Sequence, residues 1–300
     1  MNLLARFSLI FILIFAPGLT IVGYFSRQFL QTNAREQVQE QAKIMMDTAL
    51  AVRRYTSGHI QPILKSVETQ EMKFHPESVP AFAATEVFVK LRKSNDDYDD
   101  YLYKEAVLNP TNPRDQARGW EEDIVNDFRN HPEKKEVRGQ RESPAGDMMY
   151  LAHPLVVGVG EGCLRCHSTR DAAPPDMIKQ YSLEGTANGF GWKEGETIGA
   201  QVVSVPVSKP VKIADSAFRQ LMVWLLAGGL ATLAILDVTL YFAVIRPIQR
   251  MAANADATSK GEMDLPELPL AGAREISVLA AAFNRMQRSL AKAMRLIDDK

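Results

Sequence analysis

Both cysteines of this 300-residue chain lie in one short run, Cys163-Leu-Arg-Cys166-His167. The order Cys-x-x-Cys-His is the attachment signature of a c-type haem. In that chemistry each thiol adds to one vinyl group of the porphyrin, and the two-residue spacer lets a single tight turn present both sulfurs. The imidazole that follows then binds the iron. The run therefore predicts one covalent haem c per chain, attached through Cys163 and Cys166, with His167 as the proximal iron ligand.

Two other chemistries also use closely spaced cysteines. A zinc site needs further ligands, and the sequence has neither a second Cys-x-x-Cys pair nor a His-x-His pair. A thioredoxin-like dithiol needs a βαβ setting, which the flanking residues do not supply. We therefore favour haem attachment over both, and over a pair of purely structural cysteines.

Two apolar stretches, residues 7–24 and 221–244, divide the chain. Each is long enough to cross a hydrocarbon core about 30 Å thick. We favour an uncleaved anchor over a signal peptide for the first stretch, because it is long and ends without small cleavage-site residues. The predicted domains are a transmembrane anchor at residues 1–25, a haem domain at 26–220, a second transmembrane helix at 221–245 and a helical segment at 246–300.

The cellular compartment of the haem domain is inferred from the haem motif rather than from the charged residues. The formal net charge is −1, so nothing indicates nucleic-acid binding, and the lysines and arginines beside the two spans do not fix an orientation. Covalent haem is attached outside the cytoplasm in bacteria. We therefore expect a bacterial inner-membrane protein of two spans, with the haem domain in the periplasm and both termini in the cytoplasm.

The pattern of the haem domain predicts an α+β fold of PAS-like type. Residues 26–66 lack glycine before Gly58 and proline before Pro62, which indicates a long N-terminal helix continuing out of the membrane. Shorter helices are predicted at residues 79–93 and 116–128. β-branched and alternating residues between turn-forming breaks predict strands at 135–141, 148–157 and 197–207, besides a short strand after Tyr103.

The C-terminal segment carries a heptad pattern. Ile276, Phe283 and Leu290 recur every seven residues, and such a seam needs a partner helix to bury it. With Pro247 just inside the membrane and an Ala-Ala-Phe-Asn-Arg-Met run at residues 281–286, the segment resembles a HAMP domain. That resemblance implies a parallel dimeric four-helix bundle, and hence a homodimer whose HAMP helices act on a cytoplasmic output protein.

Motifs elsewhere extend the resemblance over nearly the whole chain. Besides the haem motif they are the runs Tyr-Lys-Glu-Ala at 103–106, Asn-Pro-Thr-Asn-Pro at 109–113, Trp-Glu at 120–121, Gly-Phe-Gly-Trp at 189–192 and Ile-Gly-Ala-Gln at 198–201. The chain resembles the membrane-bound c-type haem sensors of a PAS-like family first described for cyanobacterial haem proteins. The resemblance implies a non-enzymatic sensor of redox state or of a small, even diatomic, ligand. The alternative is a membrane-anchored c-type cytochrome for electron transfer, which would leave the HAMP segment without a role.

One departure from that family concerns the second axial ligand of the iron. The resemblance implies that in the founding type this ligand is a cysteine thiolate from the early helix. This chain has no third cysteine. The candidates are His59, His153, Tyr55 and Met149, or the position is open. Two histidines would favour an electron-responsive haem, whereas an open position could bind a gas.

Two further features each allow more than one interpretation. Lys104, Glu105 and Asn109 are expected either to line a ligand pocket or to stabilise the double Asn-Pro turn. Asp237 lies inside the second apolar stretch, where a carboxylate marks a functional site by default, and the alternatives are that it only snorkels or that it meets its dimer mate.

Overall fold

A computed structural model describes residues 3–71, 73–144, 146–158, 162–181, 189–262 and 264–298. The outermost residues of the predicted anchor and HAMP segments, 1–2 and 299–300, lie outside this description. The chain divides into two compact units. One contains residues 29–215, and the other combines residues 1–28 with residues 216–300.

Residues 29–215 are built on a four-stranded antiparallel sheet in the order β1-β4-β3-β2. The strands are β1 (Leu102–Val107), β2 (Val137–Ser143), β3 (Gly146–Val156) and β4 (Thr197–Pro206). The central strand β4 is buried along almost its whole length and pairs with both β1 and β3, so that Val203 lies between Tyr103 and Leu151. These findings confirm a mixed fold of helices and antiparallel sheet, while the PAS-like type stays a prediction.

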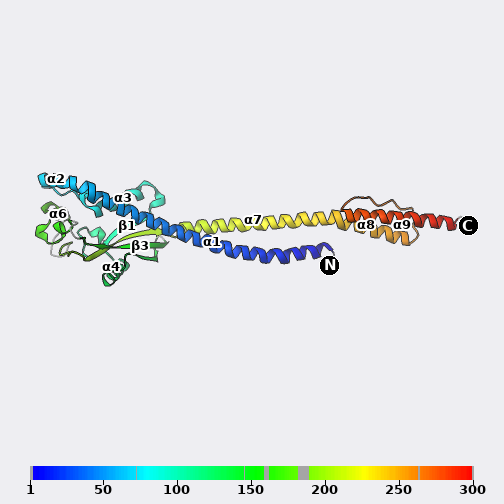
Figure 1. Ribbon diagram of the computed structural model, residues 1–300, viewed down its shortest axis with the longest axis horizontal. Coiled ribbons are helices and arrows are strands. Elements are labelled where there is room, and N and C mark those ends of the chain that lie inside the picture. Colours follow the sequence, from blue (N-terminus) through cyan, green and yellow to red (C-terminus); the bar gives the residue numbers. More distant parts are fainter. Residues whose placement is uncertain are drawn as a thin grey trace. The chain divides into compact units, whose positions relative to one another are not determined.

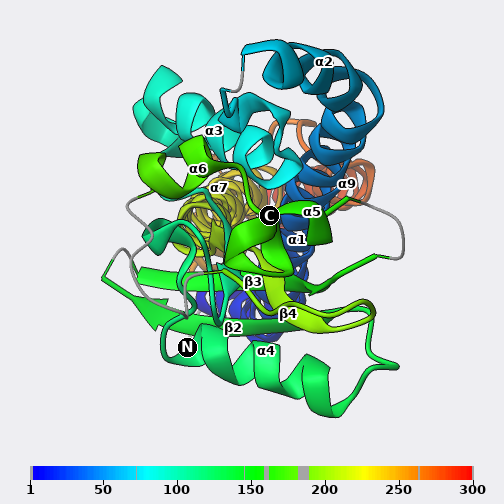
Figure 2. The ribbon, with the colours of Figure 1, turned by 90° about the vertical axis from the view of Figure 1, so that its left-hand side faces the viewer.

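Helices cover both faces of this sheet (Figure 2). Helix α1 (Leu3–Tyr55) buries small and apolar residues at every third or fourth position and packs with α3 (Pro80–Ser94) on one face. The stripe on α1 comprises Val38, Ala42, Met45, Met46 and Ala49. Helix α4 (Trp120–Asn130) packs Ile124, Val125 and Phe128 against the other face. A fully buried valine or methionine side chain contributes about 1.5–3 kcal/mol. Val38, Met45 and Met46 therefore hold α1 on the sheet.

The predicted long helix is interrupted between α1 and α2 (Gln61–Glu71), both labelled in Figure 1. A π-helical turn, Thr56–Ile60, separates the two helices, and the amide of Gln61 donates to the Thr56 carbonyl five residues earlier. Pro62 has no N–H to donate to the carbonyl of Gly58, so a regular α-helical ladder cannot continue here. Widened turns of this kind frequently occur at functional sites.

Helix α4 begins at Trp120, four residues later than the sequence predicted. Pro113–Asp115 forms a 3₁₀ turn, and Gln116 makes a β-bridge with Val107, so these residues are occupied outside the helix. Gly119, the residue before α4, has φ +55°, a positive value that glycine adopts readily and that turns the chain into the helix.

The other unit contains two helical stretches long and apolar enough to cross a membrane, one in α1 and one in α7 (Ser208–Leu240). Within it, the Ser8 hydroxyl donates to the Asp237 carboxylate, 3.1 Å from either oxygen. Gly229 allows close approach, because a Cβ there would lie 2.2 Å from the Phe15 ring. A π-helical turn, Tyr241–Ile245, then leads from α7 to the C-terminal helices.

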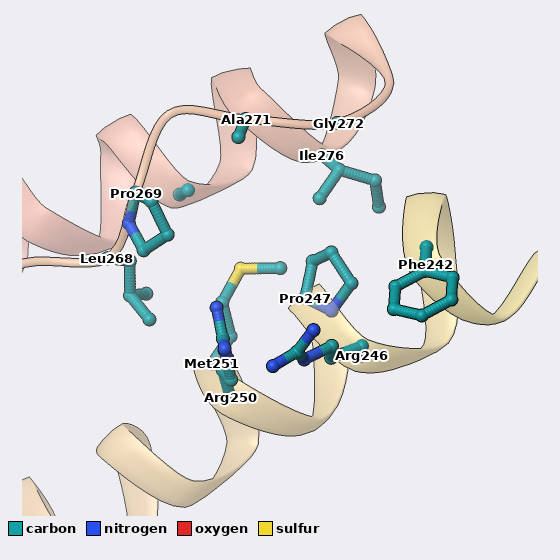
Figure 3. A pocket seen from close by; sticks show the side chains of 11 residues that line it. Phe242, Arg246, Pro247, Arg250, Met251, Leu268, Pro269, Ala271, Gly272 and Ile276 are labelled. Carbon is teal, nitrogen blue, oxygen red and sulfur yellow. The ribbon is translucent and has the colours of Figure 1, made fainter.

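Helices α8 (Arg246–Ser259) and α9 (Arg274–Asp298) are held together by the connector between them. Figure 3 shows Leu268 of the connector beside Met251 of α8, with Ile276 of α9 nearby. The buried amide of Asn284 bonds to both the N–H and the carbonyl of Leu268, each at 2.9 Å. Further hydrogen bonds run from Asn254 of α8 to the Pro266 carbonyl and from Gln287 of α9 to the Leu265 carbonyl, so the connector is fastened to both helices.

Candidate functional site

The predicted attachment residues form a single helical turn. Helix α5 (Leu164–His167) follows Cys163, whose carbonyl accepts from the amides of Cys166 at 3.2 Å and His167 at 3.0 Å. Residues three and four apart on such a turn lie on the same side. Both thiols and the imidazole line one cavity of about 570 Å³, and the two cysteines are not joined in a disulfide.

The imidazole of His167 is held on two sides. Its Nδ1 lies 2.7 Å from the carbonyl oxygen of Gly189, and its ring stacks on the Trp192 indole with centroids 3.9 Å apart and 9° between planes. Because a carbonyl can only accept, Nδ1 carries the proton and Nε2 carries the lone pair. Burial lowers the pKa of His167 and so favours this neutral form, while the Gly189 hydrogen bond has the opposite, smaller effect on the pKa. A metal-ligating histidine is typically oriented in this way.

Asn109 fixes the segment that carries the Gly189 carbonyl. Its side-chain oxygen accepts from the Gly189 amide at 2.9 Å, and its side-chain nitrogen donates to the Phe190 carbonyl at 3.1 Å. Gly189 has φ +76°, and a Cβ there would lie 2.2 Å from Thr111 Oγ1 and 2.8 Å from the Thr111 amide nitrogen. The Asn-Pro turn is therefore packed against the backbone that orients His167.

A different wall of the cavity comes from the long helix. Leu50, Arg53, Arg54, Ser57 and Gln61 line it, together with Glu105 of β1. Arg53 Nη1 lies 2.5 Å from both carboxylate oxygens of Glu105, and the Tyr103 hydroxyl donates to the same carboxylate at 2.8 Å. The side chain of Glu105 is only 2% exposed and that of Arg53 22%, so the carboxylate end of this ion pair is buried in the cavity wall.

Asp115 adds a second carboxyl group to the lining. Burial raises its pKa to about 6, against the opposing charge of Arg114. Arg114 itself pairs with Glu86 at 2.7 Å and lies over the Phe82 ring. Asp115 is therefore a group whose charge changes close to neutral pH inside the cavity.

The structure separates the predicted ligands into two groups. Cys163, Cys166 and His167 meet at the cavity, whereas His59 and His153 are not among its lining residues. His59 is exposed with its ring against Tyr55, and His153 Nε2 lies 3.2 Å from Glu136. Roles for these two histidines as distal ligands stay predictions, and nothing in the cavity lining supports them.

Three residues with two predicted roles each lie in different surroundings. Glu105 lines the cavity, Asn109 stabilises the turn, and Lys104 donates to Glu121 at 2.6 Å beside the start of α4. Met149, the methionine considered as a ligand, is buried in the core between α1 and the sheet. Within the described ranges no three histidine, cysteine or acidic side chains cluster as a metal site.

Sequence reasoning missed the polar residues of the helical wall and the two side chains Met177 and Tyr181, which also line the cavity. A signal for the wall was present in the spacing of residues 50, 54, 57 and 61, which repeats every three or four positions as one face of a helix does. That spacing could not be recognised as a cavity wall without knowing which face meets the sheet.

Comparison with known proteins agrees with the predicted resemblance. The sequence model of the Tll0287-like family matches residues 31–206, more than half of the chain, and that of the HAMP domain matches residues 240–292, which indicates signal transduction. Among solved structures, the crystal structure of the cyanobacterial haem protein Tll0287 is similar, with 14% identity, coverage of 56% of this chain and 95% of that chain, and a TM-score of 0.41. No curated protein matches the chain. The chain belongs to the Tll0287-like family and carries a HAMP domain after the family segment.

Proposed function

We propose that this protein is a membrane-anchored sensor whose cavity holds one covalent haem c and whose HAMP domain passes the state of that haem to a cytoplasmic partner. The observation that carries the proposal is the meeting of Cys163, Cys166 and a neutral, Nδ1-protonated His167 on one turn in one cavity. A bound haem would supply an iron that changes oxidation state or takes a small ligand. The proposal assigns the chain a signalling role rather than an enzymatic one.

The residues of the cavity fit such a group. Its volume of about 570 Å³ lies within the usual range of about 300–1,000 Å³ for cofactor sites. Val107, Val157 and Ile198 pack around Cys163, and Phe74 and Met177 lie in the cluster that contacts Cys166. Cys163 and Cys166 would attach the group, and His167 Nε2 would bind its iron.

A direct main-chain route leads from the haem turn to the HAMP domain. The His167 carbonyl accepts from the Trp192 amide at 3.2 Å, and Trp192 leads into β4. Strand β4 ends at Pro206, and α7 begins two residues later and continues to Leu240. A shift of His167 therefore acts on the strand that is covalently continuous with the helix entering the HAMP domain, which is how a small displacement can bias a bistable element.

The exposed seam of α9 supports a homodimer. Leu279, Met286 and Leu290 are exposed in the isolated chain although their types and spacing suit a buried helix contact. We infer that a second copy covers them and that the output protein docks on the paired helices. The haem domain would lie in the periplasm and both termini in the cytoplasm of a bacterial inner membrane.

Thiol crosslinking in the holoprotein tests signalling through the HAMP domain. A cysteine replaces Leu290 in the full chain, and a short bismaleimide measures the fraction of crosslinked dimer in the oxidised and reduced states. Arg288→Cys, on an exposed position of the same helix, is the matched control. We expect efficient crosslinking only at position 290, with a yield that depends on oxidation state or on carbon monoxide. Equal yields in all states would disprove haem-dependent signalling.

A variant without the two haem-attaching thiols is the reference for the same crosslinking experiment. In a Cys163→Ala/Cys166→Ala background, the state dependence should vanish while the dimer itself persists. A state-dependent yield without the two thiols would show that the signal does not arise at the haem turn. A state-independent yield in the holoprotein, with rapid electron exchange, would instead favour the electron-transfer cytochrome.

A further inference from the structure

The helical wall of the cavity is a row of hydrogen-bond donors. Arg53, Arg54, Ser57 and Gln61 face the cavity from α1, the π-helical turn and α2. Guanidinium and amide groups donate hydrogen bonds, and none of these four side chains binds iron as histidine, cysteine or methionine does. The described part of this wall is therefore suited to binding a ligand through hydrogen bonds rather than to coordinating a metal.

Two of these donors are already used. Arg53 is neutralised by the buried Glu105 carboxylate, which also accepts from Tyr103. The Ser57 hydroxyl donates to the Arg54 carbonyl at 3.2 Å. The charge of Arg53 and the hydroxyl proton of Ser57 are therefore both satisfied within the protein.

Arg54 and Gln61 differ from this pair. Neither side chain has a hydrogen bond or ion pair with any residue that the structure describes, although both line the cavity. Arg54 is exposed and Gln61 is half-buried, so this part of the wall is open to solvent. The charged lining residues are Arg53, Arg54, Arg114, Glu105 and Asp115, and two of the arginines have carboxylate partners, in Glu105 and Glu86. Among the described residues of this wall, the positive charge without a partner is that of Arg54.

We propose that Arg54 and Gln61 form a binding site for a carboxylate or another small oxyanion at the solvent-exposed edge of the cavity. A guanidinium matches the planar, two-oxygen geometry of such a group, and charge-assisted hydrogen bonds are about twice as strong as neutral ones. The group has two possible sources, a propionate of the haem or a free anion such as nitrite. This inference rests on the proposed haem cavity and adds the chemistry of its second ligand site.

Nitrite titration of the ferric, full-length holoprotein in detergent distinguishes the sources, with the Soret band as the signal. The variants are Arg54→Gln, Arg54→Lys and Gln61→Leu. Arg35→Gln is the matched control, because Arg35 is exposed on the same helix and does not line the cavity. If the anion is free, the wild type and Arg35→Gln bind nitrite saturably, and Arg54→Gln binds about tenfold more weakly. Arg54→Lys should recover part of the affinity, and Gln61→Leu should lose less than Arg54→Gln.

If the anion is the haem propionate, nitrite does not bind saturably to the wild type or to either of the two Arg54 variants. The midpoint potential then reports the contact: Arg54→Gln should lie below both the wild type and Arg35→Gln, because loss of a positive charge favours the ferric state, and Arg54→Lys should restore it. Indistinguishable behaviour of Arg54→Gln and Arg35→Gln in both measurements overturns the anion site. A wild-type protein without a haem spectrum would instead overturn the proposed function, before any anion is added.

Discussion

The Nδ1 proton of His167 is directed at the carbonyl oxygen of Gly189, 2.7 Å away, in a backbone segment that Asn109 holds from the other side. This contact fixes which nitrogen of the imidazole has the lone pair. It also makes the orientation of the proximal residue depend on the Asn-Pro turn, which is distant in sequence.

Asn109→Ala removes both hydrogen bonds to residues 189 and 190. At about 1 kcal/mol for each net hydrogen bond, we expect the free energy of unfolding to fall by about 1–3 kcal/mol. Because the Gly189 carbonyl is then less well fixed, the midpoint potential of the holoprotein should change as well. The matched control is Asn95→Ala, because the Asn95 side chain accepts only from the nearby Asp97 amide among the described residues and does not line the cavity. Equal potentials for the two variants would refute the positioning role of Asn109.

Gly189→Ala tests the close approach of the turn to this segment. A Cβ at residue 189 meets Thr111, whereas a Cβ at Gly191, which has φ +80°, meets nothing within 4 Å. Both variants carry the strain of a left-handed backbone, about 1–3 kcal/mol, and only Gly189→Ala adds a steric clash. Urea unfolding should therefore show a clearly larger loss for Gly189→Ala, and equal losses would contradict the packing described.

Much of the site is local enough to follow from sequence. Cys163, Cys166 and His167 share one turn because their spacing leaves little alternative, and the heptad of α9 is a repeated pattern along one helix. The strands were predicted close to their observed bounds, since turn residues separate them. The helical wall could not be predicted, because only the packing of α1 on the sheet decides that Ser57 faces the cavity.

Helix geometry also explains why His59 does not face the cavity. Successive residues of a helix are about 100° apart, so residues two positions away from Ser57 point to nearly the opposite side. His59 therefore lies on the exposed face, beside Tyr55. The late start of α4 has a similar origin, since the β-bridge of Gln116 to Val107 is a tertiary contact that helix propensity does not report.

Asp115 should make stability depend on pH in an unusual direction. Burial raises its pKa from 3.8 to about 6, so between about pH 4 and 6 the native state binds more protons than the unfolded chain. Stability from this group is present at low pH and is lost as pH rises through 6. The difference in unfolding free energy between wild type and Asp115→Asn should therefore shift by on the order of 3 kcal/mol against the wild type over this window. A difference that does not vary with pH would show that Asp115 is not buried as described.

Glu105→Gln tests the ion pair of Arg53 and Glu105 in the cavity wall. Removal of one partner leaves the Arg53 charge uncompensated, and such changes cost about 3–5 kcal/mol. The double variant Arg53→Met/Glu105→Met should recover much of that loss, because both charges are removed. Glu196→Gln is the control: its pair with Arg129 is exposed, and its loss should cost less than about 1 kcal/mol. Similar losses for Glu105→Gln and Glu196→Gln would contradict the burial of the Glu105 carboxylate.

Covalent attachment at the α5 turn is the central claim, and denaturing electrophoresis with a haem stain tests it most directly. The full chain is produced with a bacterial cytochrome c maturation system, as wild type, as Cys163→Ala/Cys166→Ala, and as the Arg35→Gln control. We expect haem to migrate with the denatured wild-type and Arg35→Gln chains and to be absent from the double variant. Haem that dissociates from the wild-type chain on denaturation, or that stays attached without the two cysteines, would contradict covalent attachment at this turn.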